Sequence, residues 1–414
     1  MQPGGERGAL EFGRELCGDL HAAEQREWLV TNGIGGYASG TVAGVLTRRY
    51  HGLLVAAVHP PVAHRLLLTK LDETATYDGT DYALFADRWD GREAQPAGFH
   101  FLESFHLEGT TPVWTFALAD ALLEKRVWMQ PGANTTYIRY TLRRGSGPLA
   151  LKIDALVNHR DHHGNTHAYE QPLDLAVVPL EHGLRVDGGL GRTPFHLLSD
   201  VASATPDPRW VHGYYLRVED YVGLDPLDDN LSAGTFEATI ELGQSATIVA
   251  STESAPDLDG AMAYELRLAG EELLLEQARS VLDTRSPAIE RLVLAADQFI
   301  VDRRLPDGSQ GKSVIAGYPW FGDWGRDTMI SLPGLTLATG RYDVAARILL
   351  TFSHYASEGM LPNRFPDEGQ APEYNTVDAT LWYFEAIRAH YAVAGSQALV
   401  QDLFPVLVDL VDWH

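Results

Sequence analysis

Apolar and polar residues follow two different periods along the chain, and the change falls near residue 255. From about Glu27 to Ser251, short runs rich in β-branched and aromatic residues are separated by turn residues. Strands of this length at this spacing are typical of a large antiparallel β-sandwich. Alternation within Thr136–Leu142 and Ala238–Leu242 further predicts strands with one buried face. The clearest runs are Gly52–Ala56, Thr115–Leu118, Thr136–Leu142, Leu149–Ile153, Ala238–Leu242 and Ala246–Ala250.

Beyond Ser254–Asp257 the apolar residues recur at helical spacing. Gly340, Gly359 and Gly395 stand where three of the helical patterns stop, as helix-terminating glycines do. Helix pairs joined alternately by tight turns and long polar loops predict a helical toroid whose long loops gather on one face. The predicted helices are Leu258–Leu282, Pro287–Val301, Thr328–Thr339, Tyr342–Ser357, Val377–Ala394 and Leu399–Trp413.

Composition narrows the classes of partner. With 414 residues, 45% of them hydrophobic and 21% charged, the chain is long enough for two or three soluble domains. Its 56 acidic and 32 basic residues give a formal charge of -24, which repels phosphate backbones and anionic lipid surfaces. We therefore expect no nucleic-acid partner and no membrane contact.

Cysteine content and apolar run length bear on location. The single cysteine, Cys17, excludes an internal disulfide framework, and the polar segment Met1–Arg7 lacks the layout of a signal peptide. No apolar run approaches the ~20 residues that span a bilayer. A cytoplasmic location is the expectation.

One segment, Gly317–Asp327, concentrates aromatic, carboxylate and guanidinium groups between glycines and a proline. Aromatic faces stack on the C–H faces of pyranose rings, and fixed carboxylate and guanidinium groups hydrogen-bond sugar hydroxyls. The segment therefore predicts a sugar pocket. The alternative is that its aromatic residues fill a core, that Arg326 and Asp327 form a structural ion pair, and that Asp327 caps the next helix.

A second polar and aromatic cluster supports the functional interpretation. It comprises Asn363–Glu368 and Glu373–Asp378 and lies in another long loop between predicted helices. Two such loops among otherwise short connections favour a site over a core.

Three motifs, taken in order, resemble the prokaryotic glycogen debranching enzymes of the amylo-α-1,6-glucosidase type. They are Glu27–Tyr37 with Arg48–Gly52, then Trp320–Asp327, then Tyr374–Trp382, and together they extend over nearly the whole chain. The resemblance implies a β-sandwich followed by an (α/α)6 barrel, the six-hairpin glycosidase architecture that glucoamylases share. It also implies hydrolysis of α-1,6-linked glucose stubs in glycogen with inversion, and no cofactor.

The resemblance and the change of period together divide the chain into three parts. Residues 1–255 are the predicted β-sandwich N-terminal domain, residues 256–285 a helical linker, and residues 286–414 the first part of the (α/α)6 catalytic barrel. A closed double ring needs roughly twice the helices predicted after Pro287, because each inner helix is covered by an outer one. We therefore expect an incomplete toroid that continues beyond His414.

In the family, the general acid is the aspartate of an Asn-x-x-Asp-Ala motif, which corresponds to Asp378 here. The resemblance places the partner base, a glutamate, beyond residue 414. With Asn375 or Thr376 as N-cap, Asp378 falls in the first helical turn, where the helix dipole lowers a carboxyl pKa. A general acid needs the opposite shift, which the surrounding aromatic residues and a nearby carboxylate such as Glu373 would supply.

The remaining candidates are predicted to bind substrate. An arginine beside two carboxylates keeps Asp323 and Asp327 ionised, so we expect both, with Arg326, to grip hydroxyls of the terminal glucose. Asp378 has the alternative role of a helix cap, and Glu373 is a reserve acid. The full predicted substrate-binding set is Trp320, Asp323, Trp324, Arg326, Asp327, Arg364, Glu373 and Asn375.

Three N-terminal motifs are interpreted as structural. Asn32–Gly36 is not a phosphate-binding glycine loop and predicts a tight turn, and Arg48–His51 is expected to contact the helical domain. The cluster Asn158–His167 suggests a metal site, but adjacent histidines point to opposite sides of a strand and no second ligand group has suitable spacing. We expect no metal there, and either a loop that reaches toward the barrel or an ordinary polar loop.

Three functions follow. The first is an exo-acting α-1,6-glucosidase, for which this chain, lacking the base, is expected to be inactive alone. The second, from a different class, is a glycan-binding fragment without turnover. The third is another (α/α)6 glycosidase or phosphorylase of glucoamylase-like type. The expected partner in each case is glycogen or a branched α-glucan.

Overall fold

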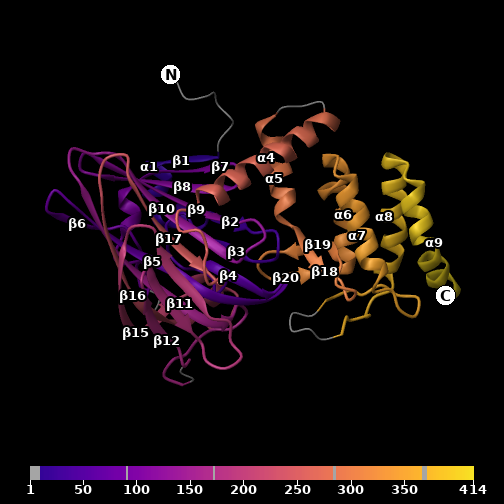
Figure 1. Cartoon of the computed structure of the whole chain (residues 1–414), viewed down its shortest axis with the longest axis horizontal. Coiled ribbons are helices and arrows are strands. Elements are labelled where there is room, and N and C mark those ends of the chain that lie inside the picture. The colour runs from indigo at the N-terminus through magenta and orange to yellow at the C-terminus, as the bar shows by residue number, and fades with distance from the viewer. Residues whose placement is uncertain (1–9, 90–91, 171–172, 283–285, 366–370) are drawn as a thin grey trace. The chain divides into compact units, whose positions relative to one another are not determined.

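The computed structural model describes residues 10–89, 92–170, 173–282, 286–365 and 371–414 (Figure 1). It contains two compact units. The first comprises residues 1–32, 36–56 and 64–266, and the second residues 33–35, 57–63 and 267–414. The end of the predicted linker, 283–285, and the part of the second polar cluster at 366–368 lie outside the described residues.

Two antiparallel sheets make up most of the first unit. In spatial order, the nine-stranded sheet contains β1 (Glu11–Gly13), β7 (Leu102–Glu108), β8 (Thr111–Leu118), β9 (Ala121–Met129), β10 (Thr135–Arg144), β17 (Ser245–Ser251), β14 (Phe195–Ser199), β13 (Gly183–Asp187) and β12 (Ala176–Leu180). The eight-stranded sheet contains β15 (Ser203–Tyr215), β16 (Leu227–Ile240), β11 (Leu149–Asp161), β5 (Val62–Tyr77), β4 (Gly52–His59), β3 (Tyr37–Thr41) and β2 (Glu27–Thr31), with β6 (Thr80–Ala83) paired to β5. Short helices α1 (Arg14–Cys17), α2 (Leu20–Glu24) and α3 (Arg217–Tyr221) and the 3-10 turn η1 (Gly98–Phe101) accompany them.

The inner faces of the two sheets pack against each other. Trp28 of β2 meets Trp114 of β8 edge to face, with ring centroids 5.3 Å apart. Buried Glu73 of β5 accepts a hydrogen bond from the Tyr140 hydroxyl (2.7 Å) and pairs with Lys125 (2.5 Å) across the same space. The predicted β-rich N-terminal domain is therefore confirmed.

Five of the six predicted strand runs lie entirely within strands, and two details of the prediction are corrected. β10 is buried on both faces through Thr135–Leu142, with Arg139 partly exposed, so the prediction of a single buried face was wrong. The strand predicted to reach Leu242 ends at Ile240, because a turn follows in which Gly243 has a left-handed φ of 82°.

Helices dominate the second unit, and they are drawn from orange to yellow in Figure 1. Gly340 and Gly395 adopt left-handed φ values of 78° and 61° at two helix ends, as the sequence predicts. The helices are α4 (Ala261–Val281), α5 (Pro287–Gln298), α6 (Gly325–Leu335), α7 (Tyr342–Ser353), α8 (Asp378–Ala394) and α9 (Gln397–Asp412), with the 3-10 turn η2 (Leu337–Thr339).

A three-stranded sheet in this unit was missed from sequence. It consists of β18 (Ile300–Arg304), β19 (Gln310–Gly317) and β20 (Phe321–Asp323). The predicted helix Pro287–Val301 therefore ends at Gln298, and Ile300 and Val301 belong to a strand. The helix predicted to reach Ser357 ends at Ser353.

One apolar cluster joins helices α6 to α9 of the second unit, and α4 and α5 pack in another. Leu332 of α6, Ile348 and Phe352 of α7, Tyr383 of α8 and Leu403 of α9 are each fully buried in it. Burial of side chains of this size contributes about 1.5–3 kcal/mol each, which fixes the ends of these helices relative to one another. Among the described residues, no helix is long and apolar enough to cross a membrane.

Candidate active site

The two polar segments singled out in the sequence meet beside β20 and the start of α6. The backbone N–H of Glu373 donates to the carbonyl of Arg364 (2.9 Å), and isolated bridges join Arg364 to both Trp324 and Glu373. The N–H of Phe365 donates to the carbonyl of Asp323 (3.3 Å). Backbone pairing thus brings three predicted residues, Trp324, Arg364 and Glu373, into adjacent positions.

Gly325 permits this close approach. Its N–H donates to the carbonyl of Asn363 (2.9 Å), and a Cβ built on it would lie 2.1 Å from the carbonyl oxygen of Pro362. Real side chains never approach a backbone oxygen so closely. A glycine at this position is therefore required for α6 to start against the 361–365 segment.

Arg326 and Asp378 form a two-pronged ion pair between α6 and α8. The Nε of Arg326 lies 2.8 Å from Oδ2 of Asp378, and Nη2 donates to Oδ1 at 2.9 Å. Nη2 also donates to the hydroxyl of Thr376 at 2.8 Å, and that hydroxyl donates to Asp378 in turn. Both side chains remain about two-fifths exposed, at 44% and 41%.

Asp378 is the first residue of α8, so its predicted place in the first helical turn is confirmed. The N-cap is Val377, however, and not Asn375 or Thr376. The Thr376 hydroxyl and the Arg326 guanidinium lower the pKa of Asp378, and burial offsets little of that effect. The rise in pKa expected from aromatic desolvation is absent, because the side chain is exposed.

Asp323 lies at the end of β20 and is completely buried. Its Oδ2 accepts hydrogen bonds from Arg303 Nε (2.7 Å) and the Ser313 hydroxyl (3.0 Å). Its Oδ1 has no hydrogen-bond partner among the described residues. The prediction that Arg326 is the arginine partner of Asp323 and Asp327 was therefore wrong.

Arg303 was missed from sequence, because the apolar residues before it extend a helical pattern. Its guanidinium lies 4.2 Å from the ring centre of Phe365 and makes a cation–π contact there. Burial of a charged pair needs such additional contacts to offset desolvation. Arg303 thereby links the three-stranded sheet to the segment that carries Arg364.

The aromatic residues of the first motif do not fill a core. Trp320 and Phe321 are 44% and 51% exposed, and Trp324 is half-buried with its ring edge-on to Phe321 at 5.8 Å. Trp382 on α8 is also 40% exposed. Indole and phenyl faces are thus available at the surface, and Trp382 lies about one helical turn after Asp378 on α8.

The other predicted residues make weaker contacts. Arg364 Nη1 lies 3.5 Å from Glu373 Oε1, and Asn363 Nδ2 donates to Asn375 Oδ1 at 3.1 Å. Asp327 is exposed in the first turn of α6, whose N-cap is Trp324, so the capping role considered for Asp327 was wrong.

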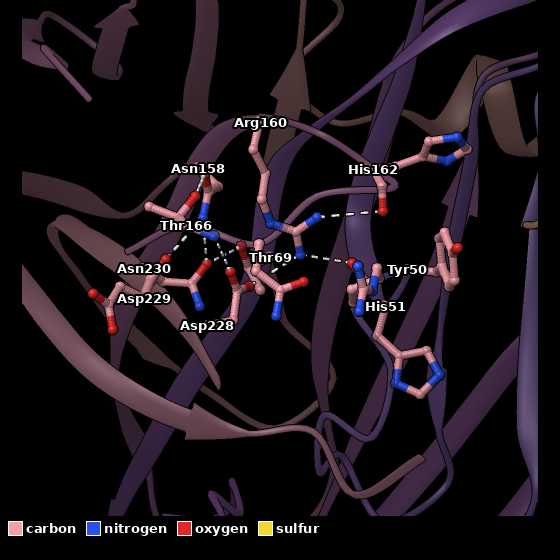
Figure 2. Close-up of polar contacts among 12 residues, drawn as sticks. Tyr50, His51, Thr69, Asn158, Arg160, His162, Thr166, Asp228, Asp229 and Asn230 are labelled. Carbon is pink, nitrogen blue, oxygen red and sulfur yellow. Dashed lines mark hydrogen bonds and ion pairs between the residues drawn. The ribbon is translucent and has the colours of Figure 1, made fainter. Parts of the chain in front are cut away.

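The Asn158–His167 motif starts at the end of β11, continues as the expected polar loop from His162, and forms part of a buried polar network, drawn in Figure 2. Asn158 and Arg160 lie within β11. Arg160 Nη2 lies 3.0 Å from Asp228 Oδ2 and donates to the carbonyl of Arg49 at 2.6 Å, and Asn158 Nδ2 donates to Asn230 Oδ1 at 3.1 Å (Figure 2). Across the described part of the chain, no three His, Cys, Asp or Glu side chains are grouped to hold a metal ion.

The other two N-terminal motifs make structural contacts. Arg49 pairs with buried Glu219 (3.0 Å) and Arg48 with Glu27 (2.6 Å). The Asn32–Gly36 segment makes a tight turn, closed by a bond from the N–H of Asn32 to the carbonyl of Gly36 (3.2 Å). The predicted contact of Arg48–His51 with the helical domain stays a prediction.

Comparison with known proteins covers both halves of the chain. Residues 26–247 match the family model described as glycogen debranching enzyme N terminal, and residues 294–414 match the one described as amylo-alpha-1,6-glucosidase. A glycogen debranching enzyme of Saccharomyces cerevisiae is 36% identical over 101 residues, which are 23% of this chain and 6% of the yeast protein.

Two solved structures are similar at low identity. A putative kojibiose phosphorylase from human microbiome has 9% identity and a TM-score of 0.47, over 99% of this chain and 59% of that one. A bacterial glucoamylase complexed with acarbose has 11% identity and a TM-score of 0.45, over 94% of this chain and 58% of that one. The chain thus spans less than two thirds of the length of each of these relatives.

Proposed function

The chain belongs to the glycogen debranching enzyme family, and we propose that the protein hydrolyses α-1,6-linked glucose stubs of glycogen or limit dextrin, with inversion at the anomeric carbon. Asp378 is the general acid that protonates the departing glycosidic oxygen. The observation that carries the proposal is the Arg326–Asp378 ion pair, which joins the segment that carries exposed Trp320 and half-buried Trp324 to the start of α8.

Asp378 is held as a carboxylate in this structure, whereas a general acid must carry a proton. We infer that glucose hydroxyls compete for Arg326 when the stub binds. Loss of the guanidinium from Asp378 and exclusion of water by the sugar then both raise the pKa of the carboxyl. Substrate binding thereby creates the acid form that the reaction needs.

Asp323 and Asp327 accept further hydrogen bonds from hydroxyls of the terminal glucose. Oδ1 of Asp323 is a fully buried acceptor with no hydrogen-bond partner among the described residues, so a sugar hydroxyl satisfies it only when the side chains that cover it move aside. Exposed Asp327 offers a second acceptor. Trp320 and Trp324 supply faces for stacking on the pyranose ring.

Arg364, Glu373 and Asn375 form the outer part of the proposed site. Glu373 is held near Arg364 and serves as the reserve candidate for the acid. The general base is a second carboxylate about 6.5–9.5 Å from the acid, as inversion requires, and we assign it to no residue of this chain. Helices α5 to α9 would be the first part of an (α/α)6 toroid that surrounds the two carboxylates.

The proposed partner is a branched α-glucan, and the proposed location is the cytoplasm. The test is incubation of the protein, made from its whole gene, with phosphorylase-limit dextrin, with and without phosphate, followed by assay of free glucose. Phosphate-independent release of glucose supports the proposal. Release of glucose 1-phosphate that depends on phosphate would identify a phosphorylase, and binding without turnover a glycan-binding protein.

A further inference from the structure

One cavity lies wholly within the first unit and plays no part in the proposed hydrolysis. Its volume is about 420 Å³. The side chains that line it are mainly charged, and they come from α2, from the segment after β6, and from the end of β15 with the start of α3. The relevant ones are His21, Glu24, Arg88, Arg92, Tyr215 and Arg217.

Two of the three arginines share one buried carboxylate. Arg88 Nη1 lies 2.9 Å from Glu24 Oε2, and Arg217 Nη1 pairs with Glu24 Oε1. The Arg88–Glu24 contact lacks hydrogen-bond geometry, although Arg88 is only 9% exposed. One negative charge therefore serves two guanidinium groups, each of which carries five N–H donors.

Backbone contacts hold the arginines at the cavity. The N–H of Tyr215 donates to the carbonyl of Arg88 at 2.8 Å, and the N–H of Arg92 donates to the carbonyl of Trp89 at 2.9 Å. The preceding residue, Asp87, is buried and pairs with buried Lys70. The segment that carries Arg88 is thus fixed before any ligand arrives, which reduces the entropic cost of binding.

The charge of the lining is opposite to that of the protein. The chain carries a formal charge of -24, yet three arginines line this cavity against two carboxylates, Glu24 and Glu93. Glu24 is occupied by Arg88 and Arg217, and the Tyr215 hydroxyl already donates to Asp220 (2.5 Å). The cavity lining therefore has more guanidinium N–H donors than carboxylate oxygens to accept from them.

We propose that this cavity binds a phosphate group, either as inorganic phosphate or as part of a hexose phosphate. The planar guanidinium fork matches phosphate oxygens in bidentate fashion, and an anion neutralises the excess positive charge. A cavity of this volume also has room for a sugar ring attached to the phosphate. The inference does not rest on the proposed glucosidase activity.

The test is isothermal titration calorimetry of the full chain at pH 7 and constant ionic strength with inorganic phosphate, glucose 6-phosphate and glucose. Saturable binding with one site per chain is expected for one or both phosphates and none for glucose. The tighter of the two ligands identifies the source of the phosphate group. No saturable binding of either phosphate overturns the proposal.

Single-residue variants distinguish phosphate binding in the cavity from non-specific attraction to surface arginines. Arg92→Gln leaves the Glu24 ion pairs intact and is expected to weaken phosphate binding about tenfold, the loss of one charged hydrogen bond. Arg217→Gln is expected to do the same. Arg209→Gln removes an exposed arginine paired with Asp207 elsewhere in the first unit and should leave binding unchanged. Equal weakening by Arg92→Gln and Arg209→Gln would show non-specific attraction and sink the proposal.

Discussion

Arg326 holds both carboxylate oxygens of Asp378, at 2.8 and 2.9 Å, and joins the start of α6 to the start of α8. Each residue comes from one of the two sequence clusters. Both side chains of the pair are about two-fifths exposed, so solvent screens its contribution to stability. Its importance is therefore for the charge on Asp378 and not for the strength of the fold.

Removal of Arg326 should change the titration of Asp378. In Arg326→Gln we expect the pKa of Asp378 to rise from its present lowered position toward the ordinary aspartate value, because one of the two groups that stabilise the carboxylate is gone. Carbon-13 NMR of the side-chain carboxyl as a function of pH measures this. Arg364→Gln removes an arginine that pairs with Glu373 and should leave the Asp378 titration where it was. An unchanged pKa in Arg326→Gln would contradict the account.

Gly325 and Gly334 give a matched comparison within one helix. Gly325→Ala places a Cβ 2.1 Å from the Pro362 carbonyl oxygen, whereas Gly334 has open space where its Cβ would be. We expect Gly325→Ala to lower the free energy of unfolding by about 1–3 kcal/mol, the usual range for overpacking. Gly334→Ala should leave it unchanged or raise it by up to about 1 kcal/mol. Urea denaturation measures both, and equal effects would refute the close approach of α6 to the 361–365 segment.

The buried pair Arg303–Asp323 should stabilise the second unit. Asp323→Asn leaves the Arg303 guanidinium without its charge partner in a buried place, which costs about 3–5 kcal/mol. Asp327→Asn, four residues along and exposed, should cost less than about 1 kcal/mol, the effect of one charge at a helix start. Chemical denaturation followed by tryptophan fluorescence compares the two. If Asp323→Asn lowers the free energy of unfolding no more than Asp327→Asn does, the burial of the Asp323 carboxylate is contradicted.

Protonation of Glu27 should reduce the stability of the first unit at low pH. Burial raises the pKa of its carboxyl, but hydrogen bonds and charges from His51 and Arg48 outweigh burial and bring it from 4.5 to about 2. A carboxyl with a depressed pKa in the folded state contributes stability above 4.5, and that contribution is lost as the pH falls from about 4.5 to 2. Stability measured by urea denaturation should therefore fall less steeply in Glu27→Gln over this range. Glu15→Gln, which removes an exposed carboxylate on α1, should keep the wild-type slope.

The sequence predicts the helices and strands because their periods are strong. The left-handed glycines at 340 and 395 end two helices where the pattern stops, and Asp378 does fall in the first turn of α8. β18 was missed because Ile300 and Val301 continue a helical apolar pattern. They form a strand because they pair with β19, and this tertiary contact is not visible in the local sequence.

The ion pairs between residues of the site were harder to predict from sequence than the residues that belong to it. Arg326 was paired with Asp327 because the two are adjacent, but successive residues of a helix diverge by about 100° around its axis. Arg326 therefore points to Asp378, more than fifty residues away, while Asp323 takes Arg303 from a neighbouring strand. Such pairings depend on how distant segments meet, and no local pattern encodes them.

The central claim is that Asp378 delivers the proton. Its most direct test is the turnover of Asp378→Asn, made in the protein produced from its whole gene, on two substrates. The glycosidic oxygen of limit dextrin must be protonated before it can leave. The leaving group of α-glucosyl fluoride is fluoride ion, which departs without a proton. The account predicts that hydrolysis of limit dextrin falls by about 10²–10⁴-fold while that of the fluoride is largely kept. Undiminished release of glucose from limit dextrin by Asp378→Asn would contradict it.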